Sequence, residues 1–170
     1  MIKPESKKLL YRYISSPIGQ LLIAGDAEGL HVIGFPEGKG KVTPPEDWIA
    51  DKYCLPEVET QLGEYFGGER KEFDLELCPH GTEFQLEVLH ALQRIPYGAT
   101  CSYVSLAEDI GRPKAVRAVG SANGRNPIPI IIPCHRVIGA DGSLTGFGGG
   151  LPAKQFLLSL EGGGQASLDF

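Results

Sequence analysis

Residues 130–138 read Ile-Ile-Ile-Pro-Cys-His-Arg-Val-Ile, and this stretch decides how the rest of the chain is interpreted. The aliphatic residues on both sides predict a buried, extended segment of backbone. Polar groups in such a segment cost desolvation energy unless they are paired or used in chemistry. An isolated Cys-His pair is most often a structural cysteine beside a surface histidine. Here, however, a thiol stands next to an imidazole and a permanent cation, which predicts a thiolate nucleophile at Cys134.

The composition around this stretch is that of a globular protein. With 42% hydrophobic and 22% charged residues, the 170-residue chain can form one domain or two small ones. No aliphatic run is long enough to cross a membrane, and the first residues lack a secretory signal, so we expect a cytoplasmic protein without membrane contacts. The four cysteines contain no Cys-x-x-Cys pair, so we expect neither a disulfide framework nor a metal site, and no cofactor.

Charge is distributed unevenly along the chain. The net charge of −5 lies entirely in residues 1–79, which carry 9 Lys/Arg and 14 Asp/Glu, whereas residues 80–170 carry 7 of each. Residues 110–140 contain no acid and five cations, namely Arg112, Lys114, Arg117, Arg125 and Arg136. A basic segment on an acidic protein predicts a phosphate-binding surface.

The first half of the chain predicts a small antiparallel β-sheet with one helix. Apolar runs at residues 9–15, 21–24 and 30–35 are separated by turn sequences, and residues 36–56 are interpreted as a loop. Helical spacing from Val58 to Phe66 ends at two glycines, and residues 73–77 alternate like a further strand. We place a domain boundary after residue 79, so the predicted domains are residues 1–79 and 80–170.

The second half predicts a mostly helical domain of the winged-helix or helix-turn-helix type, which makes the whole chain α+β. Thr82 and Gln85 form a capping box for one helix, and Ser102 can cap a second. Pro113 suits the first position of a third helix over residues 114–122. That helix is rich in small residues but carries Lys114 and Arg117, which favours docking into a nucleic-acid groove.

With these motifs assembled, residues 81–162 resemble the O6-alkylguanine-DNA alkyltransferases, also called methylated-DNA–protein-cysteine methyltransferases. The matching text is Gly81-Thr82-x-Phe84-Gln85, Ile95-Pro96-Tyr97-Gly98-x-Thr100-x-Ser102-Tyr103, Arg117-Ala118-Val119-Gly120, Asn126-Pro127, Ile132-Pro133-Cys134-His135-Arg136-Val137, Gly146, Gly149 and Leu157-Leu158-x-Leu160-Glu161-Gly162. The N-terminal third is similar to the family only in length and β character.

The resemblance implies a single-turnover repair protein whose partner is double-stranded DNA that contains O6-alkylguanine. It implies irreversible transfer of the alkyl group to Cys134 by a protein that acts as a monomer. It leaves O4-alkylthymine open as a second substrate. His135 would be the base, acting through a water because neighbours on an extended backbone point to opposite faces. Glu161 would orient the imidazole, and Asn126 would brace the preceding turn.

The resemblance also implies the residues that hold DNA and the base. Arg117 would fill the gap left by the flipped guanine, and Tyr103 would contact the adjacent phosphate and help protonate the leaving base. The remaining expected DNA contacts are Ala118, Lys114, Arg125 and Arg136. The expected base pocket consists of Phe147, Gly148, Gly149, Val137 and Pro129. Many relatives carry Tyr where this chain has Phe147, so one hydrogen bond to the base is in doubt.

Three alternatives stay open at this point. An alkyltransferase-like protein binds lesions without repairing them, but such proteins replace the cysteine that is present here as Cys134. A Cys-His-Glu hydrolase or acyltransferase would leave the basic segment unexplained. A transcription factor without catalysis would leave the Cys-His-Glu set unexplained.

Overall fold

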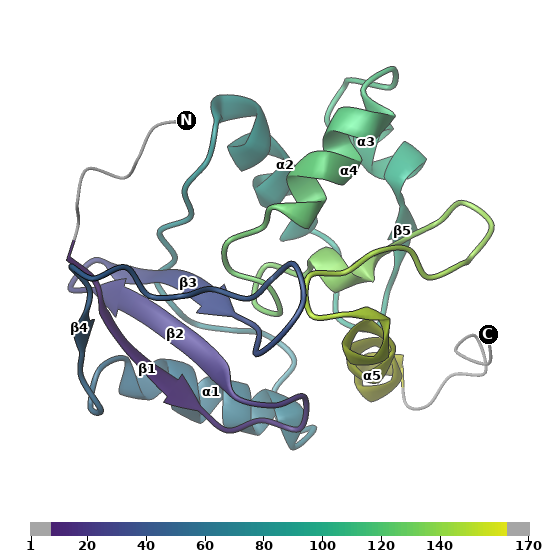
Figure 1. The fold of residues 1–170 in the computed structure, drawn as a ribbon. Coiled ribbons are helices and arrows are strands. Elements are labelled where there is room, and N and C mark those ends of the chain that lie inside the picture. Colours follow the sequence, from purple (N-terminus) through teal and green to yellow (C-terminus); the bar gives the residue numbers. More distant parts are fainter. Residues whose placement is uncertain (1–7, 163–170) are drawn as a thin grey trace.

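The structure is a computed structural model that describes residues 8–162, and its N-terminal half is built on a four-stranded sheet (Figure 1). Strands β1 (Leu10–Ile14), β2 (Leu21–Asp26) and β3 (Gly29–Gly34) form the expected antiparallel meander. A short strand that the sequence did not predict, β4 (Ile49–Ala50), pairs in parallel with β1 and gives the order β3-β2-β1-β4. Its two residues lie in the segment interpreted as a loop, because so short a strand has no alternating pattern.

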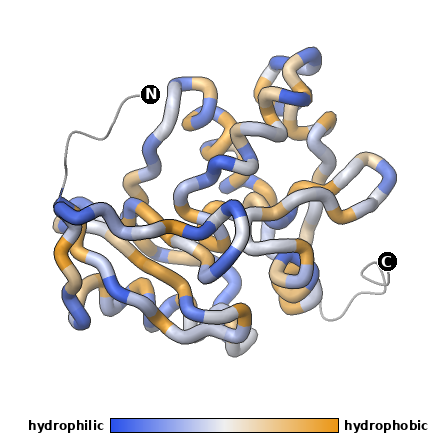
Figure 2. The backbone as a smooth tube through the Cα atoms, in the orientation of Figure 1, coloured by the Kyte–Doolittle hydropathy of each residue, from blue (hydrophilic) through white to orange (hydrophobic). Residues whose placement is uncertain are grey.

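Helix α1 (Pro56–Phe66) covers one face of this sheet, as Figure 1 shows. Proline at its start and Gly67 at its end agree with the predicted helix. Its buried residues Val58, Leu62 and Tyr65 join the same core as the strand residues. In Figure 2 hydrophobic residues run along β2, whose first four residues are almost completely buried.

The strand expected at residues 73–77 is wrong. Only Leu77 forms a β-bridge, with Leu30 of β3. The side-chain amide of Gln61 instead binds Asp74, accepting from its N–H at 2.8 Å and donating to its carbonyl at 3.0 Å. Because the Gln61 side chain satisfies the N–H and the carbonyl of Asp74, this segment does not need hydrogen bonds from a neighbouring strand.

The second half consists of helices that pack against the core of the first. Helix α2 (Glu83–Leu92) has the predicted capping box, and α3 (Tyr103–Asp109) is capped by Ser102. Helix α4 (Val116–Gly124) begins later than expected. Pro113 is not its first residue, because residues 112–115 form a turn closed by the Ala115 N–H and the Arg112 carbonyl at 2.9 Å. Helix α5 (Leu151–Gly162) follows the glycine-rich segment.

The central motif is not an extended segment, which corrects the expectation for Cys134 and His135. Cys134–Arg136 form one turn of 3-10 helix, and only β6 (Val137–Ile138) is a strand, paired in parallel with β5 (Cys101–Ser102). Pro133 has no N–H for a ladder, and Ile130 has a left-handed φ of 74°. The chain therefore turns locally, with the Arg136 N–H bound to the Pro133 carbonyl at 3.0 Å.

Buried residues of both halves form one continuous hydrophobic cluster, to which β2, α1, α2, α4 and α5 all contribute. Within residues 8–162, no helix is long and apolar enough to cross a membrane. The site described next lies where the two halves meet.

Candidate active site

A buried carboxylate, Glu161 in the last turn of α5, binds groups from both halves of the chain. Its Oε2 accepts from the Tyr65 hydroxyl at 2.6 Å and lies 2.7 Å from His135 Nε2. The Arg136 guanidinium donates through Nε to Oε1 at 2.7 Å and through a second nitrogen to Oε2 at 3.0 Å. Tyr65 belongs to α1, so this network joins the N-terminal helix to the Cys-His-Arg turn.

The charge on Glu161 is maintained by these partners. Burial alone raises the pKa of its carboxyl, but hydrogen bonds from His135 and Arg136, together with the positive charge of Arg136, outweigh burial and lower the pKa to about 2. Burial and the nearby Glu161 charge raise the pKa of Tyr65, so its hydroxyl keeps its proton and donates. The site thus contains an ionised carboxylate with strong donors.

His135 is neutral and oriented. Burial lowers the pKa of its imidazole and outweighs the raising effect of Glu161. With the Nε2 proton on the Glu161 side, Nδ1 carries a free lone pair. Nδ1 is buried and has no hydrogen-bond partner among the described residues, which makes it available as a base.

Cys134 is a buried thiol that is protonated at rest. Burial raises its pKa to about 11, although a hydrogen bond from Asn126 and the charge of Lys154 act in the opposite direction. Asn126 also braces the turn, since its Nδ2 donates to the Ile132 carbonyl at 2.7 Å and its Oδ1 accepts from the Ile128 N–H at 2.9 Å. Nucleophilic attack therefore requires a base to remove the thiol proton.

Lys154 is a buried cation that the sequence interpretation missed. Its Nζ donates to the Val137 carbonyl at 2.7 Å and to the Thr145 carbonyl at 3.3 Å. Burial lowers its pKa to about 8, which leaves it mostly charged at neutral pH. Helical periodicity could have identified it, because Lys154, Leu157, Leu158 and Glu161 share the i, i+3, i+4, i+7 face of α5.

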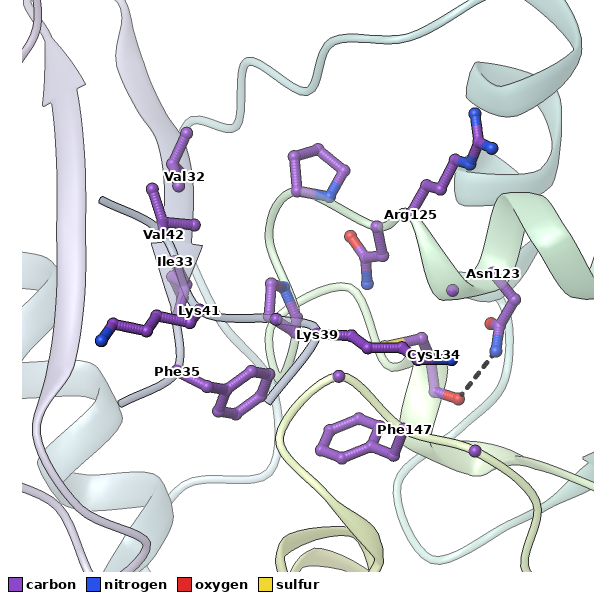
Figure 3. Close-up of a pocket in the computed structure, with 17 residues that line it drawn as sticks. Val32, Ile33, Phe35, Lys39, Lys41, Val42, Asn123, Arg125, Cys134 and Phe147 are labelled. Atoms are coloured by element: carbon purple, nitrogen blue, oxygen red, sulfur yellow. Dashed lines mark hydrogen bonds between the residues drawn. The ribbon is translucent and has the colours of Figure 1, made fainter. Parts of the chain in front are cut away.

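A cavity of about 300 Å³ opens onto Cys134 between the two halves (Figure 3). Of the expected pocket residues, Phe147, Gly148 and Pro129 line it. Val137 and Gly149, which were also expected there, are not among the residues that line this cavity. The Val137 carbonyl is bound to Lys154, and Gly149 packs so closely on Phe35 that an added Cβ would lie 2.8 Å from its ring.

The opposite wall comes from the N-terminal half and was not anticipated. It consists of Val32, Ile33, Phe35, Lys39, Gly40, Lys41 and Val42. The Gly40 N–H donates to the Gly148 carbonyl at 2.8 Å. The rings of Phe35 and Phe147 pack edge to face, with their centroids 5.2 Å apart. A Cβ at Gly40 would lie 2.6 Å from the Phe35 ring, so this approach requires glycine.

The expected DNA contacts separate into two groups. Lys114, Arg117, Ala118 and Arg125 are exposed on or beside α4. Tyr103 is half-buried, with its hydroxyl 2.6 Å from Thr145 Oγ1. Arg136 differs from the expectation that it contacts DNA. Its guanidinium is buried and bound to Glu161 and to the Ile95 carbonyl, so it is not available to phosphate.

One group of side chains could hold a metal ion. Ligand atoms of Asp26, Glu28 and His31, at the turn between β2 and β3, all lie within 4.8 Å of one another. His31 also lies 2.7 Å from His80, between Nδ1 and Nε2. The sequence patterns did not single out these residues because their spacing matches no metal-binding motif.

Comparisons with known proteins match both halves of the chain. Residues 83–163 match the family model described as 6-O-methylguanine DNA methyltransferase, DNA binding domain, and residues 9–79 match its ribonuclease-like domain. A methylated-DNA–protein-cysteine methyltransferase of Methanosarcina acetivorans is 54% identical over 154 residues, covering 91% of this chain and 99% of the relative. A Mycobacterium tuberculosis relative is 50% identical over 151 residues, covering 89% and 91%.

The fold agrees with solved structures. The Mycobacterium tuberculosis OGT crystallised in complex with DNA has a TM-score of 0.86 at 49% identity, covering 94% of this chain and 97% of that one. An O6-methylguanine-DNA methyltransferase of Pyrococcus kodakaraensis has a TM-score of 0.62 at 25% identity, covering 91% and 99%.

The Glu161 network makes a testable contribution to stability. Glu161→Ala should lower the free energy of unfolding by about 3–5 kcal/mol, because Arg136 is then left buried without its counter-ion. Urea denaturation measures this change. Glu64→Ala, which breaks the partly exposed pair with Arg70, is the matched control and should cost less than about 1 kcal/mol. Equal costs for the two substitutions would contradict a structural role for the network.

Acid should remove this contribution. The folded pKa of Glu161 is about 2, below the ordinary value of 4.5, so the folded state holds fewer protons than the unfolded state between these values. The stabilisation is complete above pH 4.5 and is lost as pH falls toward 2. Glu161→Gln should flatten the fall in unfolding free energy in this window, measured by urea denaturation at a series of pH values. If the pH dependence of the unfolding free energy is the same in Glu161→Gln as in the wild type, groups other than Glu161 cause the loss of stability in acid.

Proposed function

This chain belongs to the 6-O-methylguanine DNA methyltransferase family, and from that membership and its site we propose that Cys134 is the acceptor of the alkyl group. The protein is a DNA-repair methyltransferase that binds DNA and transfers alkyl groups from methylated DNA to a cysteine of its own. The observation that carries the assignment of Cys134 is its position on the cavity, next in sequence to the His135 imidazole that Glu161 orients.

Transfer begins with removal of the thiol proton. His135 Nδ1 accepts the proton of Cys134 through one water molecule, and Glu161 stabilises the resulting imidazolium. The thiolate sulfur then attacks the alkyl carbon, so that an S–C bond forms as the C–O6 bond breaks. The electron pair of the broken bond stays on guanine.

The leaving guanine takes up one proton, which balances the proton released by the thiol. We assign its delivery to the Tyr103 hydroxyl, which Thr145 orients and which solvent reprotonates. The imidazolium returns its proton to solvent. The product is a thioether at Cys134, and the mechanism provides no step that reverses it, so each chain reacts once.

The alkylated base has to leave the stack before Cys134 can reach it. Unstacking costs a few kcal/mol, which DNA contacts must offset. Helix α4 presents Lys114, Arg117 and Ala118 on an exposed surface, and among the described residues Arg117 forms no ion pair. We assign Arg117 to the gap that the flipped base leaves, and Lys114 and Arg125 to phosphates.

The remaining expectations are also proposals. We place the domain boundary after residue 79, in the segment without helix or strand between Leu77 and α2. We place the protein in the cytoplasm, where a reducing environment keeps a nucleophilic thiol reduced, and none of the four cysteines forms a disulfide. We expect a monomer. Among the alternatives, a hydrolase and a non-catalytic transcription factor do not fit the family, and a lesion-binding protein does not need Cys134.

The acceptor assignment predicts one alkyl group per chain. After incubation with DNA that contains O6-methylguanine, intact mass and peptide mapping should place a single methyl group on Cys134, without turnover. Cys134→Ser should abolish transfer but leave DNA binding, and Cys101→Ala, which removes a half-buried cysteine, should still accept one equivalent. Methylation of Cys54, Cys78 or Cys101 in the native protein would refute the assignment.

The base-flipping assignment predicts a difference between substrates. Arg117→Ala should slow repair of duplex DNA roughly a hundredfold but leave the reaction with free O6-alkylguanine nearly unchanged, because a free base requires no extrusion. Arg117→Lys should recover part of the rate, since an ammonium lacks the planar guanidinium. Arg112→Ala is the control, because Arg112 in the same basic segment is paired with Glu87. Equal losses on duplex and free base would rule out the flipping role.

A further inference from the structure

The cavity at the acceptor cysteine carries positive charge on both of its walls. Its lining contains three cations and no acid. Arg125 comes from the C-terminal half, whereas Lys39 and Lys41 come from the segment between β3 and β4. Both lysines are exposed, and neither forms an ion pair with another described residue. The nearest acid in the sequence, Glu37, borders a separate cavity. This local positive charge on an otherwise acidic half indicates an anionic partner.

The backbone of Lys39 is held at the cavity by the glycines on either side of it. The Gly40 N–H is bound to the Gly148 carbonyl, and a Cβ at Gly38 would lie 2.9 Å from the same carbonyl oxygen. Gly38 also has a left-handed φ of 83°. In Figure 3 the Lys39 side chain extends across the cavity, in the direction of Cys134. A side chain on a fixed backbone loses less conformational freedom when it binds a partner.

The covalent structure of DNA determines where negative charge lies when a base occupies this cavity. The base reaches Cys134, but its sugar and the two phosphates beside it stay connected to the duplex and therefore remain at the open edge. A lysine ammonium binds phosphate as a compact point charge. The phosphate contacts assigned so far, Tyr103, Lys114 and Arg125, all belong to the C-terminal half. A cation on the opposite wall would hold the same nucleotide from the other side.

We propose that Lys39 binds a phosphate beside the flipped nucleotide, so that the N-terminal half holds DNA from the wall opposite to α4. The contact forms only when the base has entered the cavity, and it therefore stabilises the flipped state without reading the identity of the base. This inference rests on the proposed function, because it assumes that the base enters the cavity at Cys134.

The salt dependence of binding tests this contact. Binding to a duplex with one O6-methylguanine is measured at a series of salt concentrations, in the Cys134→Ser background so that the lesion is not consumed. Lys39→Gln should reduce the slope of log K against log salt by about 0.9, because one phosphate fewer is neutralised. At a fixed salt concentration it should weaken binding about threefold, as expected for an exposed ion pair. Lys39→Arg should keep both the slope and the affinity.

Two control variants remove the same charge from other exposed positions. Lys41 belongs to the same segment, but its side chain extends away from Cys134 in Figure 3. Lys52 follows β4, where its Nζ lies 5.2 Å from the centroid of the Tyr53 ring. Lys41→Gln and Lys52→Gln should keep the slope of the parent protein. If both reduce the slope as much as Lys39→Gln does, the effect comes from net charge and the contact is refuted.

Uncharged DNA linkages locate the phosphate. Methylphosphonates in place of the two phosphates that flank the lesion should weaken binding of the parent protein about threefold more than binding of Lys39→Gln, which already lacks the contact. The same replacement about six nucleotides away, beyond a Debye length from the lesion, should affect the two proteins equally. Equal losses at the flanking positions would also refute the contact.

The reaction with a free base separates this inference from the function on which it rests. With Cys134 intact, Lys39→Gln and the wild type should react with O6-benzylguanine at equal rates, because this compound has no phosphate, and this result also shows that the variant is folded. If Lys39→Gln loses as much on the free base as on duplex DNA, Lys39 supports the pocket and the inference fails, although Cys134 remains the acceptor. If the wild type transfers no alkyl group to Cys134, the proposed function itself fails.

Discussion

The buried carboxylate of Glu161 is the interaction on which the rest of the structure depends. It lies at the end of α5, yet it binds Tyr65 from the N-terminal helix and both His135 and Arg136 from the central turn. A buried charge is tolerated only when its hydrogen bonds are complete, and this one has partners from two segments far apart in the chain. The same network therefore holds the two halves together and orients the base beside the reactive thiol.

The cavity follows from this arrangement. One wall comes from the N-terminal segment that contains Phe35 and Gly40, and the other from the segment after α4 and the glycine-rich stretch around Gly148. Neither half alone would enclose a base. The N-terminal half carries no part of the Cys-His-Glu set, but it supplies Tyr65 to the network and half of the pocket, so its contribution to chemistry is positional rather than reactive.

Local patterns in the sequence were reliable wherever a nearby residue satisfies the backbone. The capping box at Thr82, the cap at Ser102 and the glycine stop after α1 are contacts within one turn, and all three are present as predicted. Predictions failed where the backbone takes hydrogen bonds that the pattern does not indicate, either from a distant residue or within a turn. Gln61 of α1 replaces a strand neighbour at Asp74, and the turn at Pro133 replaces the extended segment expected at Cys134.

The sequence by itself determined the chemistry: a thiol next to an imidazole, a later carboxylate, a basic helix with small side chains, and the order of the elements. Only the tertiary structure decided which charges serve which purpose. Arg136 belongs by sequence to the basic segment, but burial beside Glu161 removes it from the surface, and the charged Lys154 is hydrogen-bonded to backbone carbonyls instead of solvent. The reason is physical: burial and ion pairing depend on which segments meet in space, and a one-dimensional pattern records the identity of a charge but not its partner.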